Sequence, residues 1–158
     1  MLNHFNNTEH FLLNYKFPIN YGRKKVHNNP HCFSITMGII QELKEREDLL
    51  ENRNIHKELW DILDNFKNQT KYANFRYSAI TVNKNLKCLP HKDNNNTGNS
   101  IIIGFGDYIN GELILYDDNN KITNKLNIKH KWVMFNAGEI THSVNKFIGN
   151  RITVVYHS

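Results

Sequence analysis

The chain has 158 residues, of which 39% are apolar. That is the size of one domain, able to bury roughly two thirds of its unfolded surface in a single core. No apolar run approaches the roughly 20 residues of a membrane span, and the N-terminal segment lacks the charged and apolar regions of a secretory signal. Cys32 and Cys88 are too few for a disulfide scaffold. We therefore expect an intracellular protein, cytoplasmic or nuclear, that is not secreted and does not bind a membrane.

The formal net charge of +5 is compatible with an anionic partner such as nucleic acid. The only compact basic run is Arg23-Lys24-Lys25, which also suits a solvated loop. Abundant lysine and asparagine can equally reflect an A+T-rich genome. Charge alone therefore does not identify the partner.

The first part of the chain predicts helices and one strand. Residues 1–30 have an irregular, polar pattern, 31–40 are strand-like, and 41–52 are charged and compatible with a helix. The segment 55–66 is the most strongly predicted helix, because its apolar residues share one helical face. These residues are Ile55, Leu59, Trp60, Ile62, Leu63 and Phe66. The aromatic residues of 1–30 that could anchor it to a core are Phe5, Phe11, Tyr15, Phe17 and Tyr21.

From residue 75 onward the pattern changes to short strands separated by turns. The predicted strands are 75–82, 100–105, 112–116, 125–128, 131–135, 142–147 and 151–156. Asn110-Gly111 is a strong signal for a tight turn, and the polar run 117–120 marks another reversal. Many short strands with regular turns favour a β-sandwich or barrel.

The ordered set His91, Asp93, His142 and Arg151 carries the chemistry. Two imidazoles and one carboxylate are the ligands of the facial triad that binds Fe(II) and leaves positions open. An HxD pair alone is weak, since the His and Asp counts give about 0.4 matches by chance. Its placement supports it, because His91 and His142 each follow a predicted strand and turn.

Arg151 opens the last predicted strand, in which alternation puts Arg151, Thr153 and Val155 on one face. A guanidinium can hold a carboxylate through two parallel hydrogen bonds, which lysine cannot do. An Arg-x-Thr pair that faces into a barrel would offer a carboxylate one charged and one hydroxyl partner.

This order resembles the Fe(II)/2-oxoglutarate-dependent dioxygenases over residues 75–158. Within that superfamily, ITVNKNLKCLPHKDNNNTGNSIIIGFGDYINGELILYD and FNAGEITHSVNKFIGNRITVVYH look most like the small TET/JBP-like nucleic-acid oxygenases of microbial eukaryotes and viruses. The resemblance implies a mostly β fold with N-terminal helices on the outside of a double-stranded β-helix (jelly-roll) core. It implies one oxygenase domain over 1–158, in which 1–74 support the core formed by 75–158.

The resemblance also assigns the site. It implies that His91, Asp93 and His142 bind Fe(II), and that Arg151 and Thr153 bind the cosubstrate 2-oxoglutarate, which is consumed with O2. Asn83, Ser100 and Tyr77 are further candidate residues for binding the cosubstrate, although Asn83 could simply form a turn.

The expected reaction is hydroxylation of a C–H bond, with the methyl group of 5-methylcytosine or thymine in nucleic acid as the preferred target. A free nucleoside or short oligonucleotide remains open as substrate. The alternatives are a protein side-chain (prolyl-type) hydroxylase and a non-catalytic metal-binding jelly-roll module. An AlkB-like demethylase is disfavoured, because the segment after Arg151 lacks a second arginine. We expect a monomer.

Overall fold

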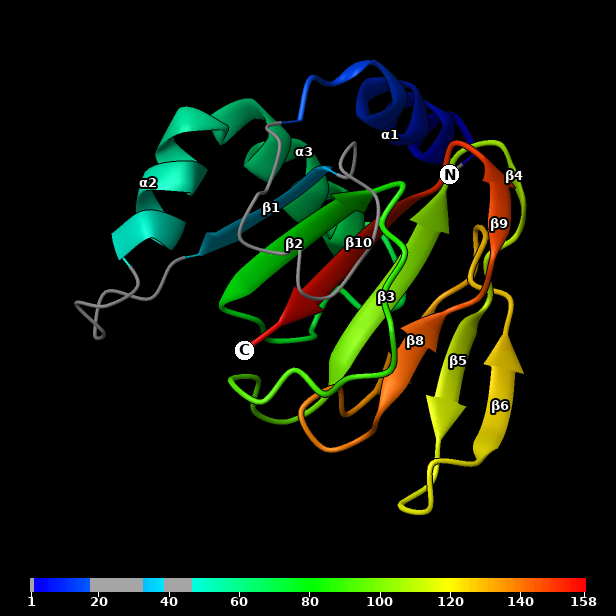
Figure 1. The fold of residues 1–158 in the computed structure, drawn as a ribbon. Helices are drawn as coiled ribbons and strands as arrows, with labels where there is room; N and C mark the ends of the chain where they lie inside the picture. The colour runs from blue at the N-terminus through cyan, green and yellow to red at the C-terminus, as the bar shows by residue number, and fades with distance from the viewer. Residues whose placement is uncertain (1, 18–32, 39–46) are drawn as a thin grey trace.

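The computed structural model describes residues 2–17, 33–38 and 47–158, and it is mostly β with N-terminal helices (Figure 1). The helices are α1 Leu2–Asn14, α2 Glu47–Ile55 and α3 Lys57–Asn68. The strands are β1 Phe33–Gly38, β2 Ala79–Lys84, β3 Ser100–Phe105, β4 Tyr108–Asn110, β5 Leu113–Tyr116, β6 Ile122–Leu126, β7 Val133–Phe135, β8 His142–Val144, β9 Phe147–Gly149 and β10 Ile152–His157.

The strands form two facing sheets and a short ribbon. The larger sheet has the antiparallel order β1-β2-β10-β3-β7, the smaller has the order β6-β5-β8, and β4 pairs with β9. The C-terminal strand β10 therefore lies between β2 and β3, where Figure 1 shows it in the middle of the larger sheet. This arrangement is the predicted jelly-roll core.

Strict alternation gives the larger sheet two different faces. Ile80, Val82 and Tyr156 belong to the core cluster that also contains buried residues of α1 and α3. The neighbouring positions Thr81 and Thr153 line a cavity on the opposite face. The helices thus cover one face of the sheet, as predicted, and the other face is left for a site.

A buried hydrogen bond ties the helical layer to the central strand. Tyr156 is fully buried in β10 and donates from its hydroxyl to the Leu63 carbonyl of α3 at 2.6 Å. Phe5, Phe11, Tyr15 and Phe17 also belong to or pack against this core, as expected. Tyr21, Cys32, His31 and the basic run 23–25 lie outside the described residues.

Several predicted element boundaries were wrong. Residues 2–14 form a helix that the polar sequence did not indicate. The predicted helix 55–66 begins at Lys57, and Ile55 is 66% exposed although it was assigned to the buried face. The helix buries Leu59, Trp60, Leu63 and Phe66, as predicted.

The predicted strand 142–147 is two strands, because the chain leaves one sheet for another. Val144 pairs with Leu113 of β5, whereas Phe147 pairs with Asn110 of the ribbon. The strand predicted over 75–82 runs instead over 79–84, since the Phe75 N–H still belongs to the turn that follows α3. The strand predicted over 125–128 covers 122–126, and β4 was not predicted. The turns at Asn110-Gly111 and 117–120 are present, with positive φ at Asn110, Gly111 and Asn120.

Among the described helices, none combines the length and apolar character needed to span a membrane.

Candidate metal and cosubstrate site

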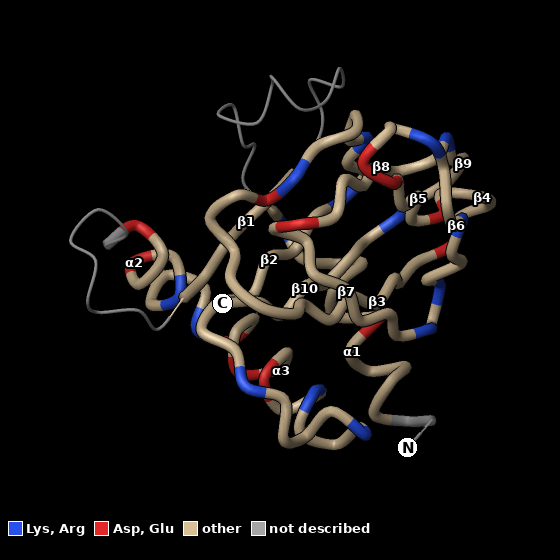
Figure 2. The backbone as a smooth tube through the Cα atoms, turned by 90° about the horizontal axis from the view of Figure 1, so that it is seen from below, with Lys and Arg blue, Asp and Glu red and all other residues tan. Residues whose placement is uncertain are grey.

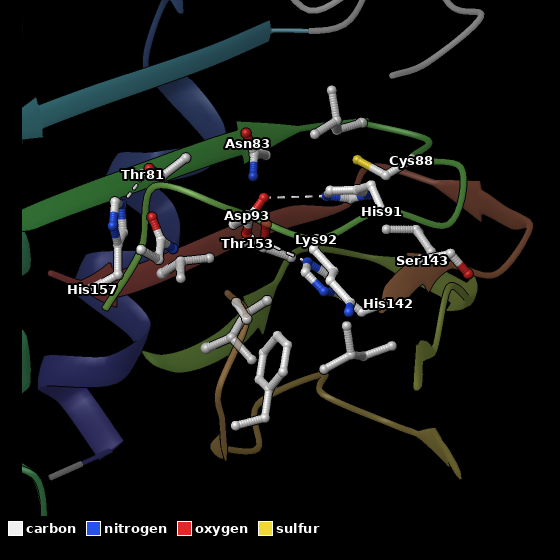
Figure 3. A pocket seen from close by; sticks show the side chains of 18 of the residues that line it. Thr81, Asn83, Cys88, His91, Lys92, Asp93, His142, Ser143, Thr153 and His157 are labelled. Atoms are coloured by element: carbon white, nitrogen blue, oxygen red, sulfur yellow. Dashed lines mark hydrogen bonds and ion pairs between the residues drawn. The ribbon is translucent and has the colours of Figure 1, made fainter. Parts of the chain in front are cut away.

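The structure brings His91, Asp93 and His142 together at one point between the two sheets (Figure 3). Their ligand atoms all lie within 4.8 Å of one another. Asp93 stands between the two imidazoles, with Oδ1 at 3.4 Å from His91 Nε2 and Oδ2 at 3.4 Å from His142 Nε2. Two residues from one turn and a third from 49 positions later in the sequence thus form a single cluster, as the sequence predicted.

Backbone pairing holds the three residues in place. His91 and His142 form an isolated antiparallel bridge, in which each N–H donates to the other's carbonyl, at 3.0 and 2.9 Å. The Asp93 N–H donates to the Ala137 carbonyl at 2.9 Å. The position of the HxD turn is therefore fixed by the same segment that carries the distant histidine.

The backbone orients both imidazole rings so that each Nε2 atom lies toward Asp93. His91 Nδ1 lies 2.7 Å from the Leu89 carbonyl, and His142 Nδ1 lies 2.8 Å from the Ile140 carbonyl. A carbonyl can only accept, so both Nδ1 atoms donate, and in the neutral imidazole the lone pair is then on Nε2. Such partners are what orient metal-binding imidazoles in proteins.

The electrostatics of Asp93 also suit a cation. Burial raises the pKa of its carboxyl, but the interactions with the nearby His142 and His91 rings outweigh burial, and the net effect holds the pKa well below its usual range. The carboxyl is therefore an anion at neutral pH. Two imidazole nitrogens and one carboxylate oxygen fit a divalent ion of the Fe(II) type, with positions left open for other ligands.

A cavity of about 460 Å³ opens beside this cluster. Thr153 of β10, Ile102 of β3 and Asn83 of β2 line it from the larger sheet, and Leu113 of β5 and Val144 of β8 line it from the smaller sheet. The loop residues 94–96, which follow the HxD turn, also line the cavity. Its volume exceeds what a five-carbon dicarboxylate occupies, so there is room for part of a substrate as well.

Arg151 lies at one end of this cavity with an unused donor. It is 2% exposed, its Nε donates to the Gly111 carbonyl at 3.0 Å, and its Nη2 has no hydrogen-bond partner among the described residues. Burial lowers the pKa of the guanidinium, but arginine remains charged at any pH the protein would meet. A buried cation with an unpaired N–H is the feature that an anionic ligand would complete.

Of the other residues predicted to bind the cosubstrate, two line the cavity and two do not. Thr153 and Asn83 line the cavity, and Asn83 Oδ1 accepts from Ser34 Oγ at 2.6 Å. Ser100 is buried with an unpaired hydroxyl but does not line the cavity. Tyr77 packs with the helices on the other face of the sheet and donates its hydroxyl to Asp64, so it is not brought to the site.

The sequence analysis missed a polar group at the opposite end of the cavity. The Thr81 hydroxyl lies 2.9 Å from the Thr36 hydroxyl and 2.8 Å from His157 Nε2. All three line the cavity, and Figure 3 shows the Thr81–His157 pair across Asp93 from His91. Alternation along the last strand could have placed His157 on the face of Arg151, but the β1–β2 register was needed to add Thr36.

No family model matches the chain, and none of the curated proteins does. Solved structures do match it. A Pseudomonas putida prolyl-4-hydroxylase aligns with 98% of this chain and 83% of its own at a TM-score of 0.54 and 11% identity. NgTET1, solved in complex with 5mC DNA, aligns with 99% of this chain and 67% of its own at a TM-score of 0.51 and 24% identity.

A 2OG-Fe(II) oxygenase-family oxidoreductase from Burkholderia pseudomallei matches 80% of the chain at 15% identity and a TM-score of 0.49, and the chain spans 65% of its length. The two matches with TM-scores of 0.54 and 0.51 support the fold, and structural similarity at identities this low leaves the substrate open. The chain has the jelly-roll fold of the 2OG-Fe(II) oxygenases, and its His-Asp-His cluster lies between the two sheets of that fold.

Proposed function

We propose that this protein is an Fe(II)- and 2-oxoglutarate-dependent dioxygenase that hydroxylates the methyl group of a modified pyrimidine, 5-methylcytosine or thymine, in nucleic acid. One observation carries the reaction class. A single cavity contains two imidazoles and one carboxylate that can bind a divalent metal and, at one end, a buried arginine with an unpaired N–H.

The residues of the chain bind and orient the reactants. Arg151 Nη2 and the Thr153 hydroxyl, two positions apart on one strand face, hold the distal carboxylate of 2-oxoglutarate. The 2-oxo acid end then reaches towards Asp93 and the Nε2 atoms of His91 and His142. Bound Fe(II) supplies the redox chemistry by which O2 and 2-oxoglutarate become succinate and CO2 while the substrate C–H is hydroxylated.

Apolar residues from both sheets limit the access of water to this chemistry. Leu113 and Ile102 are buried where they line the cavity, and Phe135 packs edge-on to the His142 ring at 5.1 Å between centroids. The ring contact restricts rotation of the imidazole, and the carbonyl of Ile140 fixes its tautomer. The site is therefore held ready for the metal by residues that take no part in the reaction.

The space left for a substrate has one polar end. Arg151 and His157 are six positions apart in extended chain. At about 3.3 Å per residue, this corresponds to roughly 20 Å. The cosubstrate occupies the Arg151 end, so the end formed by Thr36, Thr81 and His157 faces the substrate. Hydroxyl and imidazole groups can both donate and accept, which suits the polar edge of a heterocyclic base.

The net positive charge of the β-core supports an anionic substrate. Residues 75–158 contain ten Lys and Arg against six Asp and Glu, whereas residues 47–68 contain three against six. Figure 2 shows basic segments on the side of the core that carries β6, β8 and β9, with some acidic segments among them, and segments of both signs on α2 and α3. The match to NgTET1 in complex with 5mC DNA supports the same choice.

A protein side-chain hydroxylase is the second candidate, favoured by the fold match to the Pseudomonas putida prolyl-4-hydroxylase. A panel of methylated DNA, methylated RNA, nucleosides and proline-containing peptides separates the two. Succinate release is measured for each, followed by mass spectrometry of the substrate. We expect oxidation of a methylated pyrimidine, and oxidation of a peptide alone would replace this substrate with the second candidate.

A further inference from the structure

Leu89 and Pro90 form an exposed apolar step at the rim of the cavity. Both side chains are exposed, that of Leu89 by 56%. They lie between Cys88 and His91, which line the cavity, but do not line it themselves. Figure 3 shows Cys88 beside His91 at the edge of the pocket. The apolar step is therefore the outer edge of the segment that carries His91.

Backbone contacts hold this apolar step in position. The Leu89 carbonyl accepts from His91 Nδ1 at 2.7 Å, and the Cys88 carbonyl accepts from the Val144 N–H of β8 at 3.2 Å. The ring of Pro90 restricts the backbone further. A single exposed leucine is common on a protein surface, but this one is fixed beside a reaction site and adjoins a second exposed apolar residue. Such a surface favours contact with a partner.

Two lysines flank the apolar step. Lys87 precedes it, Lys92 follows it, and both are exposed. Lys87 Nζ lies 5.6 Å from the centre of the Phe147 ring of β9, and Lys92 lines the cavity. No ion pair within the described part of the chain includes either lysine. Residues 75–92 contain four Lys and Arg and no Asp or Glu, so this segment has no negative charge of its own.

A nucleic-acid strand matches this combination of charge and apolar surface. A base must leave its stack before its methyl group can reach a site between two sheets. Proteins that open base steps insert apolar side chains such as leucine and proline, and lysines neutralise the phosphates alongside. An acidic peptide would match the two lysines, but it has no stacked step for Leu89 and Pro90 to enter.

We propose that residues 87–92, the rim segment, are the surface that contacts nucleic acid at the target nucleotide. Leu89 and Pro90 pack against the base that borders the gap left by the extracted nucleotide. Lys87 and Lys92 bind phosphates of the same strand on either side of it. The proposal rests on the proposed function and identifies the part of the chain that contacts the substrate outside the cavity.

The lysines are tested by the salt dependence of binding. Fluorescence anisotropy measures the affinity of Mn(II)-loaded protein with 2-oxoglutarate for a duplex that contains one 5-methylcytosine, and for its single strand, across a salt series. Lys87→Met and Lys92→Met should each reduce the log-log slope by about 0.9 on the duplex and about 0.7 on the single strand. Lys71→Met is the matched control, because this exposed lysine lies over Tyr72 on the helical face and should leave the slope unchanged.

Leu89→Ala tests the apolar step and keeps the carbonyl that bonds to His91. We expect about tenfold weaker binding of the matched duplex, because opening a base step costs a few kcal/mol that the leucine contact offsets in part. The loss should be smaller on a duplex in which the 5-methylcytosine is mispaired, since that base leaves the stack more easily. Ile55→Ala, at a 66% exposed residue of α2, is the control. Melting temperatures and Mn(II) affinity identify any variant that does not fold.

The outcomes separate the two proposals. If wild-type protein oxidises a methylated pyrimidine while the rim-segment variants bind both oligonucleotides with wild-type affinity and slope, the role of residues 87–92 is overturned and the proposed function stands. Equal weakening of the matched and mispaired duplexes by Leu89→Ala would overturn the role of the apolar step in opening the stack. Wild-type protein that binds neither oligonucleotide and oxidises only a peptide would overturn the nucleic-acid substrate together with this surface.

Discussion

Replacing Arg151 by lysine tests whether the cavity is built for a dicarboxylate. The substitution keeps a positive charge but removes the planar group, the Nε bond to the Gly111 carbonyl and the unpaired Nη2. A hydrogen bond between charged groups contributes about 1.5 to 3 kcal/mol. Affinity for 2-oxoglutarate should therefore fall by a factor of roughly 10 to 100.

Protein stability should change less than ligand affinity in this variant. The Gly111 carbonyl loses its donor, which costs about 1 kcal/mol, and the stacking of the guanidinium between Tyr108 and Phe147 is reduced. Calorimetric titration with 2-oxoglutarate measures affinity, and urea denaturation measures stability. Arg76→Lys, at an exposed arginine, is the control. Unchanged affinity in both Arg151→Lys and Arg151→Ala would refute the assignment of this end of the cavity to a carboxylate.

Four further predictions address the metal, the scaffold and the substrate. His91→Ala and Asp93→Ala should each abolish high-affinity Mn(II) binding while circular dichroism stays like that of the wild type, and retained stoichiometric binding in both would exclude this triad. Tyr156→Phe should lose about 1 kcal/mol with the bond to Leu63, and the melting temperature should fall about 2 to 4 °C, whereas an unchanged value would mean the bond contributes nothing. Lys67→Met should destabilise the protein by about 1 to 3 kcal/mol in urea, because the Lys67 ammonium donates to the carbonyls of Tyr72, Ala73 and Phe75, and stability equal to the wild type would show that these carbonyls find other donors. Binding of single-stranded DNA should weaken with salt at a log-log slope near −0.7 per phosphate contacted, and salt-independent binding would contradict a nucleic-acid substrate.

The clustering of His91, Asp93 and His142 could be predicted from sequence because two of the three residues are neighbours in one turn. His91 and Asp93 share one turn, and a facial arrangement needs only one more ligand from elsewhere. The order of His142 and Arg151 along the chain then restricts the topology. Arg151 directly precedes β10, and its place on the same face as Thr153 follows from the alternation of an extended chain.

The polar end of the cavity depends on strand pairing that the sequence does not reveal. Thr36 meets Thr81 only because β1 pairs with β2 in one register, and a shift of β1 by one residue would turn Thr36 to the helical face. Tyr77 was misplaced for a related reason. It precedes β2 and packs against the helices, so its position was set by the turn after α3 and not by strand alternation.

Local sequence also fails where tertiary packing decides the structure. Helix α1 is rich in asparagine and histidine, which favour a helix poorly, yet Leu12 is fully buried and Glu9 accepts from the Gly106 N–H and from His130. These contacts with the β-core stabilise a helix that propensity alone would not.

The most direct test of the account follows the oxygen atoms. Fe(II)-loaded protein is incubated with 2-oxoglutarate, oxygen-18 gas and the substrate that the panel identifies. Succinate and the hydroxylated product are analysed by mass spectrometry, and His142→Ala is the control. We predict one labelled oxygen atom in succinate and one in the hydroxylated product, and neither product from the variant. Succinate without label, or equal turnover by His142→Ala, would contradict a dioxygenase built on this triad.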